Sequence, residues 1–272
     1  MNFGILIYDL VVGARHVSIA SMKAPLLLAL FGLATNFSAA QKTSDLGYLE
    51  DWGDLLQRFV VGAGVDYPAW HADPSSREQL ERAIAEAGTI PLQDLTQEAA
   101  KAHLINVYNM NMVGIVLDRW PVESVATMLP DFGIFTAPLV PLDGGRLVSL
   151  DHVEKGLLLK EYFDPRIHFA VNCASTSCPP LAREPFSPVP EELEKQLETV
   201  TRAFLNGPHA ARVNPMKNSV ALSSLFDWYA RDFAPDPLQY LNQYREPTVP
   251  AHYKLTFQRY DWSLNLPTPS ES

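Results

Sequence analysis

The stretch RIHFAVNCASTSCPPL, residues 166–181, combines a hydrophobic alternation with both cysteines of the chain. Ile167, Phe169 and Val171 would point to one side of an extended segment and His168 to the other, so the pattern predicts a strand over residues 166–173. Because His168 and the thiols of Cys173 and Cys178 fall within this stretch, it is also the expected centre of the functional site.

Outward from this stretch, helical patterns dominate the chain. The strongest predicted helix runs over about residues 95–118, with Asp94 as its cap and an apolar face that includes Ile105 and Ile115. The pattern predicts further helices at 49–60, 76–87, 151–160, 190–206 and 224–232, extended segments at 64–70 and 253–264, a turn at 143–145 and a hairpin over 211–222. This order predicts an α+β fold, a single mostly helical domain around a small antiparallel sheet.

Composition excludes several classes of protein. Of the 272 residues, 47% are hydrophobic and 19% charged, which is enough apolar material for a sizeable core and excludes a disordered chain. The formal net charge of −10 argues against a nucleic-acid partner. With only 2 cysteines a cysteine-rich zinc site is impossible, and no spaced ligand motif predicts a metal or another cofactor.

The first forty residues resemble a secretory signal. An uncharged apolar run over residues 24–34 follows Lys23, and Ser38-Ala39-Ala40 offers small side chains for cleavage before Gln41. Met22 would open a well-proportioned signal by itself, so the true start is expected there. We therefore expect a periplasmic or secreted domain over residues 41–272, with membrane contact only through an uncleaved signal segment.

The spacing of reactive groups suggests thiol chemistry. A nucleophilic thiol needs a base and a group that orients the base. Cys178 precedes two prolines and is expected at a helix N-terminus, where its pKa would fall. His168 is the expected base and Glu154, on the preceding predicted helix, its orienting group. Asn172 is the expected donor to a developing oxyanion.

Structural interpretations compete with this one. Glu154 fits a capping box with Asp151, His168 fits a satisfied core histidine, and Cys173 with Cys178 fits a disulfide in an oxidising compartment. The alternative to an enzyme is therefore a non-catalytic envelope domain with a Cys173–Cys178 disulfide. A metal-dependent site that uses His168 and Glu154 is a third interpretation, which no ligand motif supports.

The chain resembles the family called domain of unknown function 547. The resemblance rests on the 166–181 stretch, on the helix motif Asn106-Val107-Tyr108-Asn109 and on the blocks at 145–154, 226–233 and 260–265. It covers roughly residues 47–265. It implies a papain/transglutaminase-like fold with a Glu-His-Cys triad, carried here by Glu154, His168 and Cys178, and it places Asn106 and Asn109 where they line or brace the site.

The resemblance also implies a mechanism. His168 would draw the proton from Cys178, and a thioester intermediate would be resolved by water or an amine. The expected function is thus an exported cysteine hydrolase or acyl transferase, and an enzyme is a stronger prediction than a structural domain. The substrate class stays open among acyl, peptide and cell-envelope compounds.

Overall fold

The computed structural model describes residues 46–268, which lie within one compact unit of the chain, Ala40–Ser272. The predicted signal region, residues 1–40, lies outside the described residues. Between Leu46 and Thr268, no helix combines the length and the apolar character that crossing a membrane requires.

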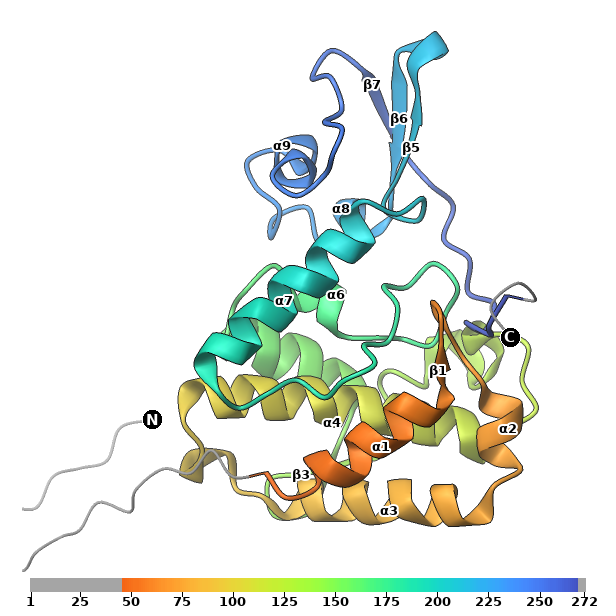
Figure 1. The fold of residues 1–272 in the computed structure, drawn as a ribbon, viewed down its shortest axis with the longest axis vertical. Helices are drawn as coiled ribbons and strands as arrows, with labels where there is room; N and C mark the ends of the chain where they lie inside the picture. The colour runs from red at the N-terminus through yellow and green to blue at the C-terminus, as the bar shows by residue number, and fades with distance from the viewer. Residues whose placement is uncertain (1–45, 269–272) are drawn as a thin grey trace, which may run out of the picture. The chain divides into compact units, whose positions relative to one another are not determined.

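Helices form most of the described structure, and Figure 1 shows α1, α3 and α4 lying together, with α7 leading toward the strands β5–β7. The α-helices are α1 (Leu49–Phe59), α2 (Tyr67–His71), α3 (Pro74–Thr89), α4 (Gln97–Asp118), α5 (Leu159–Glu161), α6 (Ile167–Ala170), α7 (Pro190–Leu205), α8 (Leu225–Trp228) and α9 (Pro237–Asn242). A π-helical segment, η4 (His152–Leu158), precedes α5, and short 3₁₀ turns include η3 (Pro130–Phe132).

The strands are short and form three small sheets. They are β1 (Val60–Val61), β2 (Gly64–Val65), β3 (Val140–Leu142), β4 (Arg146–Val148), β5 (Ala211–Asn214), β6 (Ser219–Leu222) and β7 (Lys254–Phe257). The pairs β1–β2, β3–β4 and β5–β6 are antiparallel. The predicted α+β class is therefore confirmed at this level.

One sheet departs from the predicted antiparallel arrangement. β7 pairs with β6 in parallel, with Ser219 opposite Lys254 and Leu222 opposite Phe257. The physical reason is the connection: α8 and α9 lie between the two strands and return the chain to the same end of the sheet, as a parallel pair requires.

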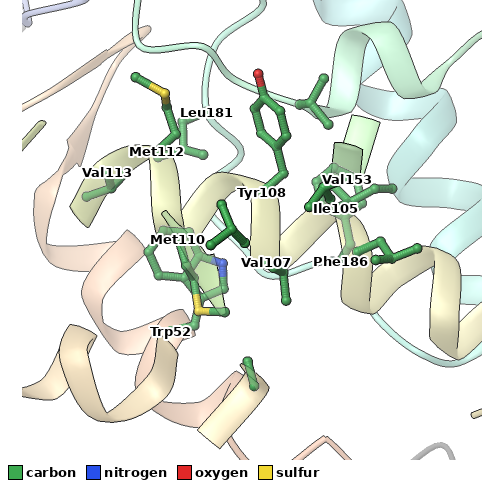
Figure 2. Close-up of a cluster of buried hydrophobic side chains, with 14 of the residues drawn as sticks. Trp52, Ile105, Val107, Tyr108, Met110, Met112, Val113, Val153, Leu181 and Phe186 are labelled. Carbon is green, nitrogen blue, oxygen red and sulfur yellow. The ribbon is translucent and has the colours of Figure 1, made fainter. Parts of the chain in front are cut away.

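Helix α4 runs through the core instead of lying on it with one apolar face. Thr96 caps its start by accepting a hydrogen bond from the Ala99 N–H, so the predicted Asp94 cap is wrong. Side chains are buried all around the helix, and Figure 2 shows Tyr108 and Leu181 on the side opposite Trp52 and Met110. A helix that is apolar all round is typical of a buried position, and α4 therefore reaches both the helical layer and the functional site.

The segment predicted as a strand at 166–173 is instead the short helix α6 followed by extended chain. Its β-branched and aromatic residues favour a strand, but its side chains serve two hydrophobic clusters. Ile167 and Ala170 belong to the cluster around α4, and Phe169 belongs to the cluster around β5–β7 and α8. A helical turn places neighbouring side chains in these different directions, so tertiary packing overrides the local propensity. His168 is thereby held between the two clusters.

Other predicted elements fit in part. The helices at 49–60, 76–87 and 190–206 and the hairpin at 211–222 are confirmed as α1, α3, α7 and β5–β6. The segment predicted as extended at 64–70 is helical from residue 67, because Asp66 caps the turn through the Ala69 N–H. Residues 224–232 hold only the short α8, and Ser224 donates its hydroxyl hydrogen bond to the Gln258 carbonyl instead of capping that helix.

Candidate functional site

A cavity of about 440 Å³ lies where η4, α6, α8 and the cysteine loop (residues 171–179) meet. This volume is within the range of small-molecule sites. The cavity contains all three residues of the predicted triad. Its lining residues are Tyr108, Asp131, Phe132, Phe135, Thr136, Asp151, Glu154, Lys155, His168, Val171, Cys173, Cys178, Pro179, Leu225, Trp228, Tyr229, Tyr260 and Trp262.

His168 is held by a carboxylate that the sequence did not point to. Its Nε2 lies 2.8 Å from Oδ2 of Asp232, and its ring packs against Tyr229 with centroids 4.1 Å apart. The side chain is only 2% exposed. Nδ1 makes no hydrogen bond within residues 46–268, and His168 lines the cavity, so one ring nitrogen is anchored and the other has no partner in the described part of the chain.

Burial sets the protonation of this imidazole. It lowers the pKa of His168 below its ordinary value of 6.5, and the carboxylates of Asp232 and Glu154 oppose that shift. A neutral imidazole with Nε2 bonded to a carboxylate and Nδ1 free has the form of a general base.

Glu154 lies near His168 but does not bond to it. Its Oε1 accepts a hydrogen bond of 2.8 Å from the Tyr229 hydroxyl, and Tyr229 is the residue whose ring covers His168. Burial raises the pKa of Glu154, while Tyr229 and His168 oppose the rise. The predicted direct contact between Glu154 and His168 is therefore wrong: Asp232 bonds Nε2 of His168, and the Tyr229 hydroxyl bonds the Glu154 carboxylate.

The capping-box interpretation of Glu154 also fails. Asp151 makes no side-chain cap and instead bonds Lys155 at 2.8 Å. The predicted helix at 151–160 begins as the π-helical segment η4, and π-helical turns often occur at functional sites. In this geometry Glu154 is buried and lines the cavity instead of bonding the helix start.

The two cysteines are free thiols that lie in contact with the same backbone turn. Sγ of Cys178 accepts a hydrogen bond from the Cys173 N–H at 3.0 Å and lies 3.9 Å from the Val171 carbonyl oxygen. Sγ of Cys173 lies 3.0 Å from the Ser175 hydroxyl and 3.4 Å from that of Tyr260. The described residues show no hydrogen bond between either sulfur and His168.

The surroundings of the two thiols favour different protonation states. Burial opposes ionisation of Cys173, but hydrogen bonds from Cys178, Ser175 and Tyr260 outweigh it and lower the pKa of Cys173 to about 7. Burial raises the pKa of Cys178 well above its usual range, and the adjacent Cys173 sulfur adds to the rise. The pair thus holds one proton more tightly than the other, and Cys173 is the thiol that ionises near neutral pH.

Cys178 does not lie at a helix N-terminus. Residues 178–180 form a bend followed by chain without regular secondary structure, and α7 begins only at Pro190. A proline disfavours the helical conformation for the residue before it, so the two prolines after Cys178 work against a helix that begins at this cysteine. Helix-dipole stabilisation of this thiolate is therefore absent, and hydrogen bonds are what stabilise charge at the cysteine pair.

Two of the three predicted asparagines, Asn109 and Asn172, brace the cysteine loop, and Asn106 braces the chain at Phe186. Asn109 donates to the Ala170 carbonyl and accepts from the Asn172 N–H, and Asn106 holds both backbone groups of Phe186. Asn172 donates to the Pro179 carbonyl at 2.7 Å and accepts from the Ala174 N–H. None of the three lines the cavity, so the amide of Asn172 is engaged in the loop and the expected oxyanion role does not fit its geometry.

A C-terminal segment completes the loop. Thr176 and Ser177 donate their N–H groups to the carbonyls of Ser263 and Asp261, and Asn265 donates to the Ala174 carbonyl. Ala174 has a φ of 60°, a left-handed conformation that costs a residue with a Cβ about 1–2 kcal/mol. The pairing with residues 261–265 therefore holds the two cysteines in a strained turn.

Tyr108 contributes a hydroxyl that the sequence did not mark as functional. The side chain is 2% exposed and lines the cavity, and its hydroxyl makes no hydrogen bond within the described part of the chain. Burial raises its pKa, and the nearby Glu154 and both thiols raise it further, so the hydroxyl keeps its proton. An unpaired buried donor of this kind is available to a bound ligand.

Sequence reasoning therefore found part of the site and missed part. Glu154, His168, Cys173 and Cys178 meet at one cavity, whereas Asp232, Tyr229 and Tyr260 had no assigned role. The last three lie within the sequence blocks at 226–233 and 260–265 on which the family resemblance rests, and that was the signal for them. Within residues 46–268, no group of three or more His, Cys, Asp or Glu side chains is placed to hold a metal ion.

Fold and site together define an α+β protein with a buried imidazole and a free thiol pair on one cavity. Residues 92–205 match the model of the family described as "Protein of unknown function, DUF547". The predicted family is thus confirmed. Comparison with curated proteins gave no match, and comparison with solved structures gave none either.

Proposed function

We propose that the cavity is the active site of an exported cysteine hydrolase or acyl transferase that works through a thioester. The observation that carries the proposal is the free thiol pair beside an imidazole with one nitrogen anchored on Asp232 and the other unpaired. A thiol, a base and a group that orients the base are the parts that nucleophilic catalysis needs.

His168 acts as the general base through Nδ1. The hydrogen bond between Nε2 and Asp232 fixes the tautomer and the plane of the ring. The resemblance assigned this orienting role to Glu154, and in the proposed mechanism Asp232 takes it. Glu154 acts at longer range: it fixes the Tyr229 hydroxyl, and Tyr229 covers the ring.

The reaction has two halves. His168 takes the proton of the thiol, and the sulfur attacks the acyl carbon and forms the carbon–sulfur bond while the π electron pair of the carbonyl moves onto oxygen. As that pair returns, the leaving group departs with the proton that His168 carries. In the second half His168 takes a proton from water or an amine as that group attacks the thioester carbon. The carbon–sulfur bond then breaks, and the departing sulfur takes the proton back from His168 to restore the thiol. Tyr108, with its free hydroxyl on the cavity wall, replaces Asn172 as the proposed donor to the oxyanion.

The identity of the nucleophile rests on two arguments that differ. The resemblance assigns Cys178, whereas the hydrogen bonds around the thiols favour ionisation of Cys173. In both cases the second thiol lies in the same turn and can donate to the first. We retain Cys178 as the proposed nucleophile and make its neighbour the matched control.

Acyl-enzyme trapping tests the proposal without knowledge of the natural substrate. The reduced protein is mixed with p-nitrophenyl acetate at pH 7, quenched in acid and mapped by mass spectrometry. We expect acetylation of a single cysteine, much faster in the folded than in the unfolded chain. His168→Gln should abolish the fast phase, and the exposed His252→Gln should leave it intact.

Two cysteine variants then assign the nucleophile. Cys178→Ser should lose the acyl-enzyme and Cys173→Ser should keep it, at a rate with an altered pH dependence. The reverse pattern assigns the attack to Cys173 and keeps the reaction class. If neither cysteine reacts faster in the folded protein than in the unfolded one, thiol catalysis is excluded and the structural interpretation of the cysteines prevails.

A further inference from the structure

The outer wall of the cavity is an aromatic cluster. Trp262 is its centre, with ring centroids 4.5 Å from Tyr260, 4.7 Å from Phe132 and 5.8 Å from Trp228. Trp228 also lies 4.8 Å from Tyr260. All four rings line the same cavity that holds His168 and the thiols. Because the rings come from η3, α8 and the C-terminal segment, three separate parts of the chain converge to build this wall.

Two of these rings remain open to solvent. Trp228 is 49% exposed and Phe132 is 38% exposed, although both contact other aromatic rings of the cluster. Exposed apolar side chains that form a contiguous patch mark interaction sites, including ligand-binding grooves. The open ring faces carry the negative side of the aromatic quadrupole, which attracts a cation.

The charges at the cavity select the sign of the ligand. Asp131, Asp151 and Glu154 line it, and Lys155 is the single lysine or arginine among the lining residues. Lys155 is already paired with Asp151 at 2.8 Å. Asp131 is exposed and its carboxylate makes no ion pair or hydrogen bond within residues 46–268. An unpaired carboxylate next to open aromatic faces complements a positive group and repels a negative one.

The segment that carries Asp131 is strained. Asp131 and Phe132 have φ values of 53° and 56°, two consecutive residues other than glycine in the left-handed region. Such conformations are costly for residues with a Cβ and cluster at functional positions. Hydrogen bonds hold the segment in place: Phe135 donates to the Phe132 carbonyl, and Asp151 donates to the Phe135 carbonyl. These hydrogen bonds therefore stabilise an unfavourable backbone conformation that places the Asp131 carboxylate and the Phe132 ring at the cavity mouth.

We propose that the outer cavity binds a positively charged aliphatic amine, with the carbon chain against Trp228 and Phe132 and the ammonium group beside Asp131. The substrate class is thus an acyl compound or an acyl acceptor that carries a lysine-like ammonium group. That this amine belongs to a substrate rests on the proposed function, whereas its binding to the cavity does not. The inner part of the same cavity then receives the carbonyl group near the thiols.

Three small probes of similar length isolate the charge. Nα-acetyl-lysine amide carries the ammonium group, Nα-acetyl-norleucine amide lacks it, and Nα-acetyl-glutamate amide carries a negative charge. Dissociation constants are measured on the full-length reduced protein by tryptophan fluorescence and checked by calorimetry. We expect the lysine probe to bind about 3- to 30-fold more tightly than the norleucine probe, the range expected for a cation over aromatic rings.

Variants separate the carboxylate from the rings. Asp131→Asn should reduce the preference for lysine over norleucine and leave norleucine binding unchanged. Trp228→Ala should weaken both probes, and Trp228→Phe should restore part of the binding. Met216→Ala, at a 96% exposed position on the turn between β5 and β6, is the control that should change neither.

Several results would overturn the inference. Equal affinity for the lysine and norleucine probes, tighter binding of the glutamate probe, or a preference that survives Asp131→Asn would each remove the role of charge. Binding of a chitin disaccharide with no binding of the lysine probe would assign the aromatic wall to sugars. If instead the lysine probe binds as expected while acyl-enzyme trapping fails, the amine site stands and the proposed function falls.

Discussion

At the residue scale, Asp232 tests the anchored imidazole. It accepts at Nε2 of His168 across 64 positions of sequence, and its carboxylate raises a pKa that burial lowers. Asp232→Asn should reduce the rate of acyl-enzyme formation about 10²- to 10⁴-fold, because the ring loses its fixed tautomer. The rate requires the neutral imidazole and the substitution lowers the pKa of His168 further. The acid limb of the pH–rate profile should therefore move to lower pH.

The control for this residue is Asp227→Asn, an exposed position on α8 that does not line the cavity. The release of p-nitrophenol, followed by stopped flow from pH 4 to 9, gives both the rate of acyl-enzyme formation and the position of the acid limb. An acid limb that moves upward, or a rate equal to that of the control, would contradict the role of Asp232.

Also at this scale, Tyr108 tests the oxyanion donor. Tyr108→Phe removes one unpaired hydroxyl from the cavity wall and leaves the buried ring in place. Removal of one such donor from an enzyme site typically costs about 10²- to 10³-fold in kcat. We expect a loss of that size with little change in KM for p-nitrophenyl acetate. Tyr162→Phe, outside the cavity, should retain full activity, and a similar retention by Tyr108→Phe would exclude the hydroxyl from the reaction.

At the scale of elements, α4 supports the cysteine loop through one amide. Asn109 is the sole side-chain partner of both the Ala170 carbonyl and the Asn172 N–H within the described residues. Asn109→Leu leaves two buried backbone groups without that partner, and each costs about 1–3 kcal/mol. We expect the free energy of unfolding in urea to fall by about 2–4 kcal/mol, with a parallel loss of acyl-enzyme formation.

Asn111 supplies the matched control on the same helix. Its amide donates only to the Val107 carbonyl one turn earlier, so Asn111→Leu leaves no group of the cysteine loop unpaired. The loss of stability should stay below about 1 kcal/mol, since a single local hydrogen bond contributes little net free energy. Equal effects at the two positions would show that the loop does not depend on the Asn109 bridge.

The element that carries His168 shows how local preference and packing compete. The alternation of Ile167, Phe169 and Val171 is typical of a strand, yet the four residues of α6 are helical and buried. Local pattern reports which residues are apolar, and the two separate clusters decide in which directions they point. The cap of α4 shows the same limit of prediction from local sequence. Thr96 and Asp94 are both good capping residues, and the backbone geometry selects Thr96.

At the scale of the whole molecule, the site depends on chain outside the matched family segment. The match ends at residue 205, whereas Asp232, Tyr229 and Tyr260 follow it. Phe169 packs against Phe226 and Phe233 in the second hydrophobic cluster. A chain of residues 41–205 should therefore unfold without a cooperative transition in urea, because it exposes Phe169 and its neighbours and loses the anchor of His168.

The comparison chain is residues 41–268, which keeps both clusters and should unfold in one transition by circular dichroism. It should also retain a fast-reacting cysteine. A cooperative transition with fast thiol reaction in the shorter chain would show that residues 206–268 form a separate unit, contrary to the shared cluster.

The sequence by itself determined the family match over residues 92–205, the α+β class, the helices α1, α3 and α7, the β5–β6 hairpin and the gathering of Glu154, His168 and the two cysteines. These features depend on neighbours within a few positions or on a long specific motif. Tertiary structure alone decided three hydrogen bonds of the site: Asp232 anchors His168, the Tyr229 hydroxyl bonds the Glu154 carboxylate, and Asn172 braces the cysteine loop instead of facing a substrate. The physical reason is that tertiary packing selects hydrogen-bond partners that are far apart in sequence. The hydrophobic periodicity of a segment reports its secondary structure and does not identify the carboxylate that will bond a given histidine nitrogen.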